Sequence, residues 1–139
     1  MPARDGIVTI DTGYVRPAFC AAYLVIEDGR AAFIDTGPGR ALPRLLDALR
    51  GHGLGPDAVD WVIATHVHLD HAGAAGPLMR ELPNATFVVH PEGARHMLDP
   101  SRLEASARQV YGEEYDRHHG PMVPVAPERL RSVANGQAL

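Results

Sequence analysis

The feature that most constrains this chain is a short apolar segment, residues 61–64, that runs directly into a cluster of polar side chains. Within six residues the cluster holds three histidines and an aspartate, namely His66, His68, Asp70 and His71. The apolar segment predicts a buried β-strand, and on an extended backbone side chains two residues apart leave the same face. We therefore expect His66 and His68 to point together into one site. Asp70 and His71 should turn toward it from the loop that follows.

The side-chain types in this cluster restrict the ion that it can bind. Imidazole combined with carboxylate suits zinc, iron or manganese, whereas calcium and magnesium prefer shells made of oxygen. A single histidine is most often a surface or hydrogen-bonded residue, and the chain has 8 of them. Three histidines and an aspartate concentrated at a strand end are instead typical of a metal site. The ligand types alone leave zinc, iron and manganese open.

Length and composition indicate one domain over residues 1–139, with 45% hydrophobic and 22% charged residues, as in ordinary soluble proteins. The formal net charge of −4 offers no basic surface for nucleic acid. No apolar run approaches the ~20 residues that span a bilayer, so we expect no membrane contact. Cys20 is the only cysteine, which excludes an internal disulfide, fits a reducing compartment and suggests core packing. Residues 1–5 show no signal-peptide apolar region, so we expect a cytoplasmic protein.

Apolar periodicity and turn signals predict a sheet with flanking helices. The Asp28-Gly29 pair predicts a tight hairpin, and Ser101 with Glu104 predicts a capping box at a helix start. The fold class is therefore α/β (α+β) with a mixed β-sheet. Strands are expected at 6–10, 19–27, 30–35, 59–65, 85–90 and 128–133, and helices at 40–52, 73–82, 92–98 and 101–118.

Two segments carry a resemblance to a known family. Residues 65–73, Thr-His-Val-His-Leu-Asp-His-Ala-Gly, resemble the HxHxDH signature of the metallo-β-lactamase superfamily. Residues 33–37, Phe-Ile-Asp-Thr-Gly, resemble the strand of that family that ends in aspartate and glycine upstream of the signature. The resemblance implies an αββα sandwich with metals at one edge between two facing sheets. This chain is similar to the N-terminal half of such a sandwich.

The resemblance also implies roles for particular residues. His66 and His68 would bind a first metal, and Asp70 and His71 would bind a second. Asp35 would orient the ligand loop by hydrogen bonds without touching metal. For the intact fold it implies a hydrolase with two zinc sites, in which a metal-activated water attacks an ester, thioester, lactone or related bond of a small-molecule substrate. The four ligands are then also the catalytic residues.

The resemblance extends only to part of the family pattern. Family members draw further ligands from a C-terminal half, which would begin where this sequence stops. The later histidines, at positions 90, 96, 118 and 119, lack the Pro-Gly-His context of the next ligand. His90 ends a predicted strand and could approach the ligand edge. His96 is expected in solvent, and His118 and His119 at a helix end.

These gaps leave the function and the assembly open. A sheet without its facing sheet exposes an apolar surface, so we expect a homo-oligomer or a complementary C-terminal half. One alternative function is a non-haem iron, oxygen-dependent enzyme on the same ligand framework. Another is a catalytically incomplete half-domain that binds metal weakly or not at all.

Overall fold

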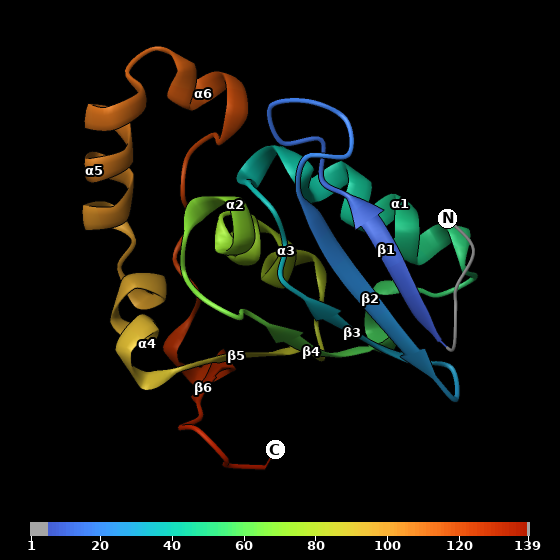
Figure 1. Ribbon diagram of the computed structural model, residues 1–139. Coiled ribbons are helices and arrows are strands. Elements are labelled where there is room, and N and C mark those ends of the chain that lie inside the picture. Colours follow the sequence, from blue (N-terminus) through green and yellow to red (C-terminus); the bar gives the residue numbers. More distant parts are fainter. Residues whose placement is uncertain (1–5, 139) are drawn as a thin grey trace.

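A mixed, six-stranded sheet forms the centre of the computed structural model, which describes residues 6–138 (Figure 1). Residues 1–5, on which the expectation about a signal peptide rests, and residue 139 lie outside the described residues. The strands pair in sequence order, antiparallel from β1 to β3 and parallel from β3 to β6. They are β1 (Ile7–Asp11), β2 (Ala21–Glu27), β3 (Arg30–Ile34), β4 (Val59–Ile63), β5 (Thr86–Val89) and β6 (Leu130–Ser132).

Helices connect the parallel strands and extend beyond them, which confirms the predicted α/β class with flanking helices. They are α1 (Leu42–Gly51), α2 (Leu69–Ala72), α3 (Ala75–Glu81), α4 (Pro91–Leu98), α5 (Ser101–Tyr111) and α6 (Glu114–His118). Short 3-10 turns lie at Gly39–Ala41, Pro56–Ala58 and Pro127–Arg129. Within residues 6–138, none of the helices has the length and apolar character needed to cross a bilayer.

The main core lies between one face of the sheet and helices α1 and α3. Alternate residues of each strand point to this face, because the side-chain period of a strand is two. The register places Leu24 opposite both Val8 and Phe33, and Val62 opposite Phe33 and Phe87. These side chains are buried in one cluster with leucines of the two helices: Leu45, Leu49, Leu78 and Leu82.

The opposite face of β1 to β4 is apolar but only partly covered. Ile7 is 46% exposed and Tyr23 is 40% exposed, although both lie within strands. Half-buried neighbours continue the surface across the sheet at Val25, Ala32, Ile34, Trp61 and Ile63. We call these seven residues the open face.

Two predicted helical features are wrong. The helix expected over 101–118 is two helices, because Gly112 adopts a left-handed φ of +57° and ends α5. The capping box is absent: Pro100 occupies the N-cap position, and no side chain caps α5. Glu104 instead accepts a hydrogen bond from the Met122 backbone N–H at 2.6 Å, which ties α5 to the segment after α6.

Candidate metal centre

Residues 64–68 join β4 to α2 and carry the predicted ligands His66 and His68, and we call this segment the metal-binding loop. β4 ends at Ile63, two residues earlier than predicted, so the extended backbone that we expected to align His66 with His68 stops before both residues. Helix α2 was not predicted, and it begins at once after His68, whose carbonyl accepts from the N–H groups of His71 and Ala72, both at 2.9 Å. The short helix turns the chain so that Asp70 and His71 face back toward the loop.

The four cluster residues lie together at this turn. The ring centroids of His66 and His68 are 4.9 Å apart, and those of His66 and His71 are 4.1 Å apart. Nε2 of His71 is 3.4 Å from a carboxylate oxygen of Asp70. His66 and His68 are exposed, whereas Asp70 and His71 are half-buried. The fold thus brings the four residues close together, but within residues 6–138 only Asp70 and His71, together with Cys20, place ligand atoms within 4.8 Å of one another.

Asp35 supports this site from behind. It follows β3 with a left-handed φ of +60°, a conformation that aspartate tolerates better than most residues, and only 6% of it is exposed. Its Oδ1 accepts from the Thr65 backbone N–H at 2.8 Å. Its Oδ2 lies 3.0 Å from Nδ1 of His71. A carboxylate accepts here, so Nδ1 carries the proton and Nε2 of His71 keeps a free lone pair.

Thr65 links the same carboxylate to a second histidine. Its hydroxyl lies 2.9 Å from each carboxylate oxygen of Asp35 and 3.0 Å from Nδ1 of His66. Because the single hydroxyl proton is donated to Asp35, the hydroxyl oxygen accepts from the His66 ring. Nε2 of His66 is then free as well. Thr65 precedes the cluster in sequence, but its bridging role is visible only in the fold.

The turn after Asp35 is bound tightly to the metal-binding loop. The Thr36 backbone N–H donates to the His71 carbonyl at 2.7 Å, and the Thr36 hydroxyl accepts from the Ala74 N–H at 3.2 Å. Gly37 has a φ of +75°, and a Cβ there would lie 2.6 Å from the Thr12 side chain. Only glycine allows this approach.

We predicted that Cys20 packs in the core, and this prediction is wrong. Cys20 immediately precedes β2, is half-buried, and its thiol donates to the Asp70 backbone carbonyl at 3.4 Å. Ligand atoms of Cys20, Asp70 and His71 all lie within 4.8 Å of one another. Burial raises the pKa of the Cys20 thiol, and the neighbouring Asp70 carboxylate adds to this effect.

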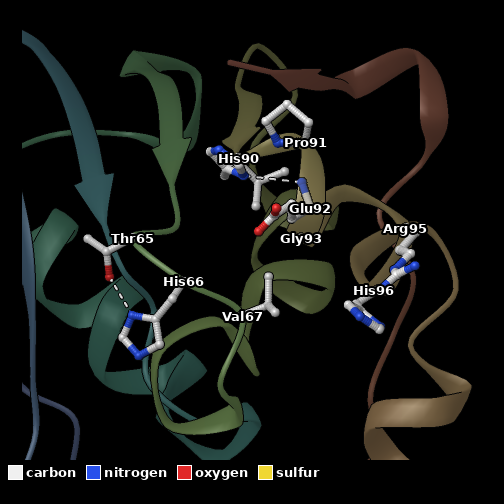
Figure 2. A pocket seen from close by; sticks show the side chains of 10 residues that line it. Thr65, His66, Val67, His90, Pro91, Glu92, Gly93, Arg95 and His96 are labelled. Carbon is white, nitrogen blue, oxygen red and sulfur yellow. Dashed lines mark hydrogen bonds between the residues drawn. The ribbon is translucent and has the colours of Figure 1, made fainter. Parts of the chain in front are cut away.

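A pocket of about 730 Å³ opens on one side of the loop, between His66 and helix α4 (Figure 2). His90 lies across this pocket from His66, as Figure 2 shows, and His96 lines it further along α4. Nδ1 of His90 accepts from the Glu92 N–H at 3.2 Å, so His90 caps α4. The structure gives His90 a helix-capping contact and does not bring it into the ring cluster of His66, His68 and His71.

A second pocket, of about 550 Å³, opens on the other side, with His68 and Asp70 in its wall. The rest of its wall is largely aromatic and apolar: Tyr14, Phe19, Leu103, Val110, Tyr111 and His119. His118 ends α6 and His119 follows it, as predicted, but His119 is only 3% exposed. Its Nε2 lies 3.1 Å from the Tyr14 hydroxyl, and burial lowers the pKa of its imidazole. The role of Tyr14 and His119 as pocket lining was not apparent from their separate places in the sequence.

The loop that carries Tyr14 and Phe19 into this pocket is ordered by one carboxylate. Asp11, at the end of β1, accepts from the Gly13 and Ala18 backbone N–H groups, both at 3.0 Å. These two backbone donors hold the pKa of the Asp11 carboxyl below its usual value. These hydrogen bonds therefore hold the loop in a fixed conformation beside the site.

The donor set fits a divalent metal ion. Two imidazoles have a free Nε2 held in place by hydrogen bonds on the opposite nitrogen, and a carboxylate stands beside one of them. A metal-ligating histidine usually has such a hydrogen bond on the ring nitrogen that does not face the ion. The fold and this site together define an α/β protein with a mixed sheet, flanking helices and a candidate metal site in the loop after β4.

Residues 15–134 match the Metallo-beta-lactamase superfamily, and the chain belongs to that family. It is similar to a subclass B3 metallo-β-lactamase from a soil metagenome library, with a TM-score of 0.74 and 24% identity over 100% of this chain and 47% of that one. A metallo-β-lactamase superfamily protein from Sulfolobus tokodaii gives a TM-score of 0.75 and 22% identity over 98% of this chain and 51% of that one. These two likenesses show the fold alone.

A relative in sequence is the hydroxyacylglutathione hydrolase of Aliivibrio salmonicida (strain LFI1238), 39% identical over 79 residues, which are 55% of this chain and 29% of that protein. The chain thus spans about half the length of the two solved structures, and its match to this hydrolase covers under a third of that protein.

Proposed function

We propose that this chain is the metal-binding part of a hydrolase that cleaves an ester, thioester, lactone or related bond. The observation that carries the proposal is the convergence of His66, His68 and His71 beside Asp70, with Asp35 fixing two of the rings from behind. Two free imidazole nitrogens beside a carboxylate have no evident structural purpose on an exposed loop. Membership in the metallo-β-lactamase superfamily supports the same conclusion.

His66 and His68 would hold one ion, and Asp70 and His71 a second, with zinc the expected metal. When bound, such ions lower the pKa of water to about 7 and polarise a substrate carbonyl. The chain's own residues prepare the site for this chemistry. Asp35 and Thr65 hold the proton on Nδ1 of His71 and His66, so that each ring presents a lone pair in a fixed direction.

The pocket beside Asp70 supports a substrate with an apolar acyl group. Phe19, Val110 and Tyr111 line it, and each is at least 46% exposed, which is costly for large apolar side chains unless they bind something. The proposed carbonyl would lie near Asp70, with the acyl chain along these side chains. The Aliivibrio salmonicida relative is a hydroxyacylglutathione hydrolase, and this likeness supports bond cleavage of this general kind.

The open face supports a facing partner. We propose that a second apolar surface covers it, supplied by another copy of this chain or by a complementary C-terminal half. The same partner would complete the ligand set, since four protein ligands shared between two ions leave several positions open.

The function is tested by metal content and hydrolysis together. We expect elemental analysis to find zinc in the purified chain. We also expect hydrolysis of a thioester with an apolar acyl chain, measured side by side for this chain and for a C-terminally extended version. His66→Ala and Asp70→Ala should each lower the rate at least 100-fold, and a chelator should abolish it, because the activated water depends on the ions. His52→Ala, a change of the same type at a helix C-cap remote from the site, is the control. Iron in place of zinc, or activity that survives both ligand substitutions, would contradict the proposal.

A further inference from the structure

Cys20 joins the metal centre from a part of the chain that the signature does not include. It lies just before β2, and its thiol reaches the short helix that carries Asp70 and His71. One ligand atom from each of these three residues lies within 4.8 Å of the other two. In a tetrahedral zinc site with bonds of about 2.0–2.3 Å, ligand atoms are about 3.3–3.8 Å apart. The observed spacing is therefore within a small side-chain adjustment of a coordination site.

The orientation of the other two groups supports this reading. Nδ1 of His71 is engaged by Asp35, so Nε2 is the atom available to an ion. That Nε2 already lies 3.4 Å from a carboxylate oxygen of Asp70, a separation that two ligands of one zinc ion would have. Cys20 is half-buried, so its thiol is not locked in the core and can turn toward the same point.

We propose that Cys20 is a third protein ligand of the ion held by Asp70 and His71. The inference rests on the proposed metal site and adds a sulfur ligand to the donor set that the HxHxDH signature supplies. On binding, the S–H bond breaks, the proton passes to solvent, and the sulfur lone pair forms the bond to the metal. A thiolate is a soft ligand, so its presence would favour zinc over manganese at this position.

Cobalt(II) substitution tests the proposal directly, because Cys20 is the only cysteine in the chain. Any sulfur-to-cobalt charge-transfer band in the near ultraviolet must then come from this residue. We expect the band in the full chain, alongside the visible ligand-field bands that report cobalt bound by nitrogen and oxygen. X-ray absorption of the zinc form should show one sulfur scatterer at about 2.3 Å.

Two variants serve as comparison. Cys20→Ser keeps the size of the side chain, and it should remove the charge-transfer band and weaken the second equivalent of metal at least tenfold, the smallest loss seen when a supporting group is removed. Phe19→Ala changes the neighbouring residue without touching the thiol, and it should leave the band intact. Circular dichroism establishes that both variants fold.

Alkylation gives a second readout, in which Cys20 itself is not substituted. A bound zinc ion should slow the reaction of iodoacetamide with Cys20 at least tenfold, and Asp70→Asn should remove most of this protection. Ligand-field bands without a charge-transfer band would overturn the role of Cys20 while leaving the histidine site standing. No cobalt binding at all would overturn both the role of Cys20 and the proposed function.

Discussion

At the scale of single residues, Asp35 organises the candidate site. A buried carboxylate is stable only when its oxygens accept hydrogen bonds, and Thr65 and His71 supply them. The same bonds fix the tautomers of His71 directly and of His66 through the Thr65 hydroxyl. One side chain therefore orients two rings, one from the loop after β4 and one from α2.

Asp35→Asn should weaken zinc binding by roughly 10–100-fold, because it replaces the acceptor that orients His71 with an amide. Competition with a chromophoric chelator measures the affinity. Asp60→Asn is the matched control, since Asp60 pairs with Arg30 on β3 and its side chain is 40% exposed. Equal affinities in the wild type and the Asp35 variant would show that this carboxylate does not support the ligands.

His119 should make the metal-free protein sensitive to acid. Burial lowers the pKa of its imidazole in the folded state, so below the unfolded pKa of about 6.5 the unfolded chain takes up a proton that the folded chain does not. The free energy of unfolding should therefore fall as the pH falls below that value, by at most about 1.4 kcal/mol per pH unit from this one group. Urea denaturation in the presence of a chelator measures this slope. His119→Gln should flatten it, and an unchanged slope would contradict the assignment.

At the scale of elements, the sequence predicted every strand of the described sheet and the hairpin at Asp28-Gly29. These features depend on the alternation of polar and apolar residues along a strand and on the residue types of a turn, both of which involve residues close together in the sequence. It did not predict the end of β4 at Ile63 or the single turn of α2, because both are set by contacts with Asp35 and Thr36 far away in sequence. For the same reason the cluster was predictable as a set, whereas the bridging hydroxyl of Thr65 and the approach of Cys20 were not.

The close contact between the turn after β3 and the loop after β1 can be measured with two glycines. Gly37 and Gly29 share a φ of +75°, but a Cβ at Gly37 would lie 2.6 Å from Thr12, whereas nothing lies within 4 Å at Gly29. Gly29→Ala should cost about 1–2 kcal/mol from backbone strain. Gly37→Ala should cost a further 1–3 kcal/mol, roughly, from overpacking. Urea denaturation of both variants gives the difference, and equal losses would show that Thr12 moves aside freely.

At the scale of the whole molecule, helices cover one face of the sheet and leave the open face only partly covered. The covered face packs against α1 and α3, and the open face presents Ile7, Tyr23 and Trp61 among its apolar residues. Contiguous apolar surface of this kind usually marks an interaction site. Strand positions alternate strictly, so the side chains that cannot join the core must all appear on this other side.

The open face should therefore drive association in solution. We expect light scattering coupled to size exclusion to give a mass above that of one chain, increasing with concentration. Tyr23→Glu should weaken the association by at least about tenfold, since burying an unpaired carboxylate costs more than the 1.4 kcal/mol that a tenfold change requires. Val110→Glu, which adds the same charge at a residue 77% exposed on α5, should have a much smaller effect. A monomer at every concentration would contradict the prediction.

The order of the strands has a consequence for how the chain is made. Each strand pairs with the one synthesised just before it, so a chain leaving the ribosome finds an edge already in place for every new strand. Pairing between successive segments keeps loop-closure costs small and favours early folding. The strands on both sides of β4, which are β3 and β5, are complete once Val89 has been added. The sheet around the loop after β4 can therefore form during translation, while α4, α5 and the later residues are still being added.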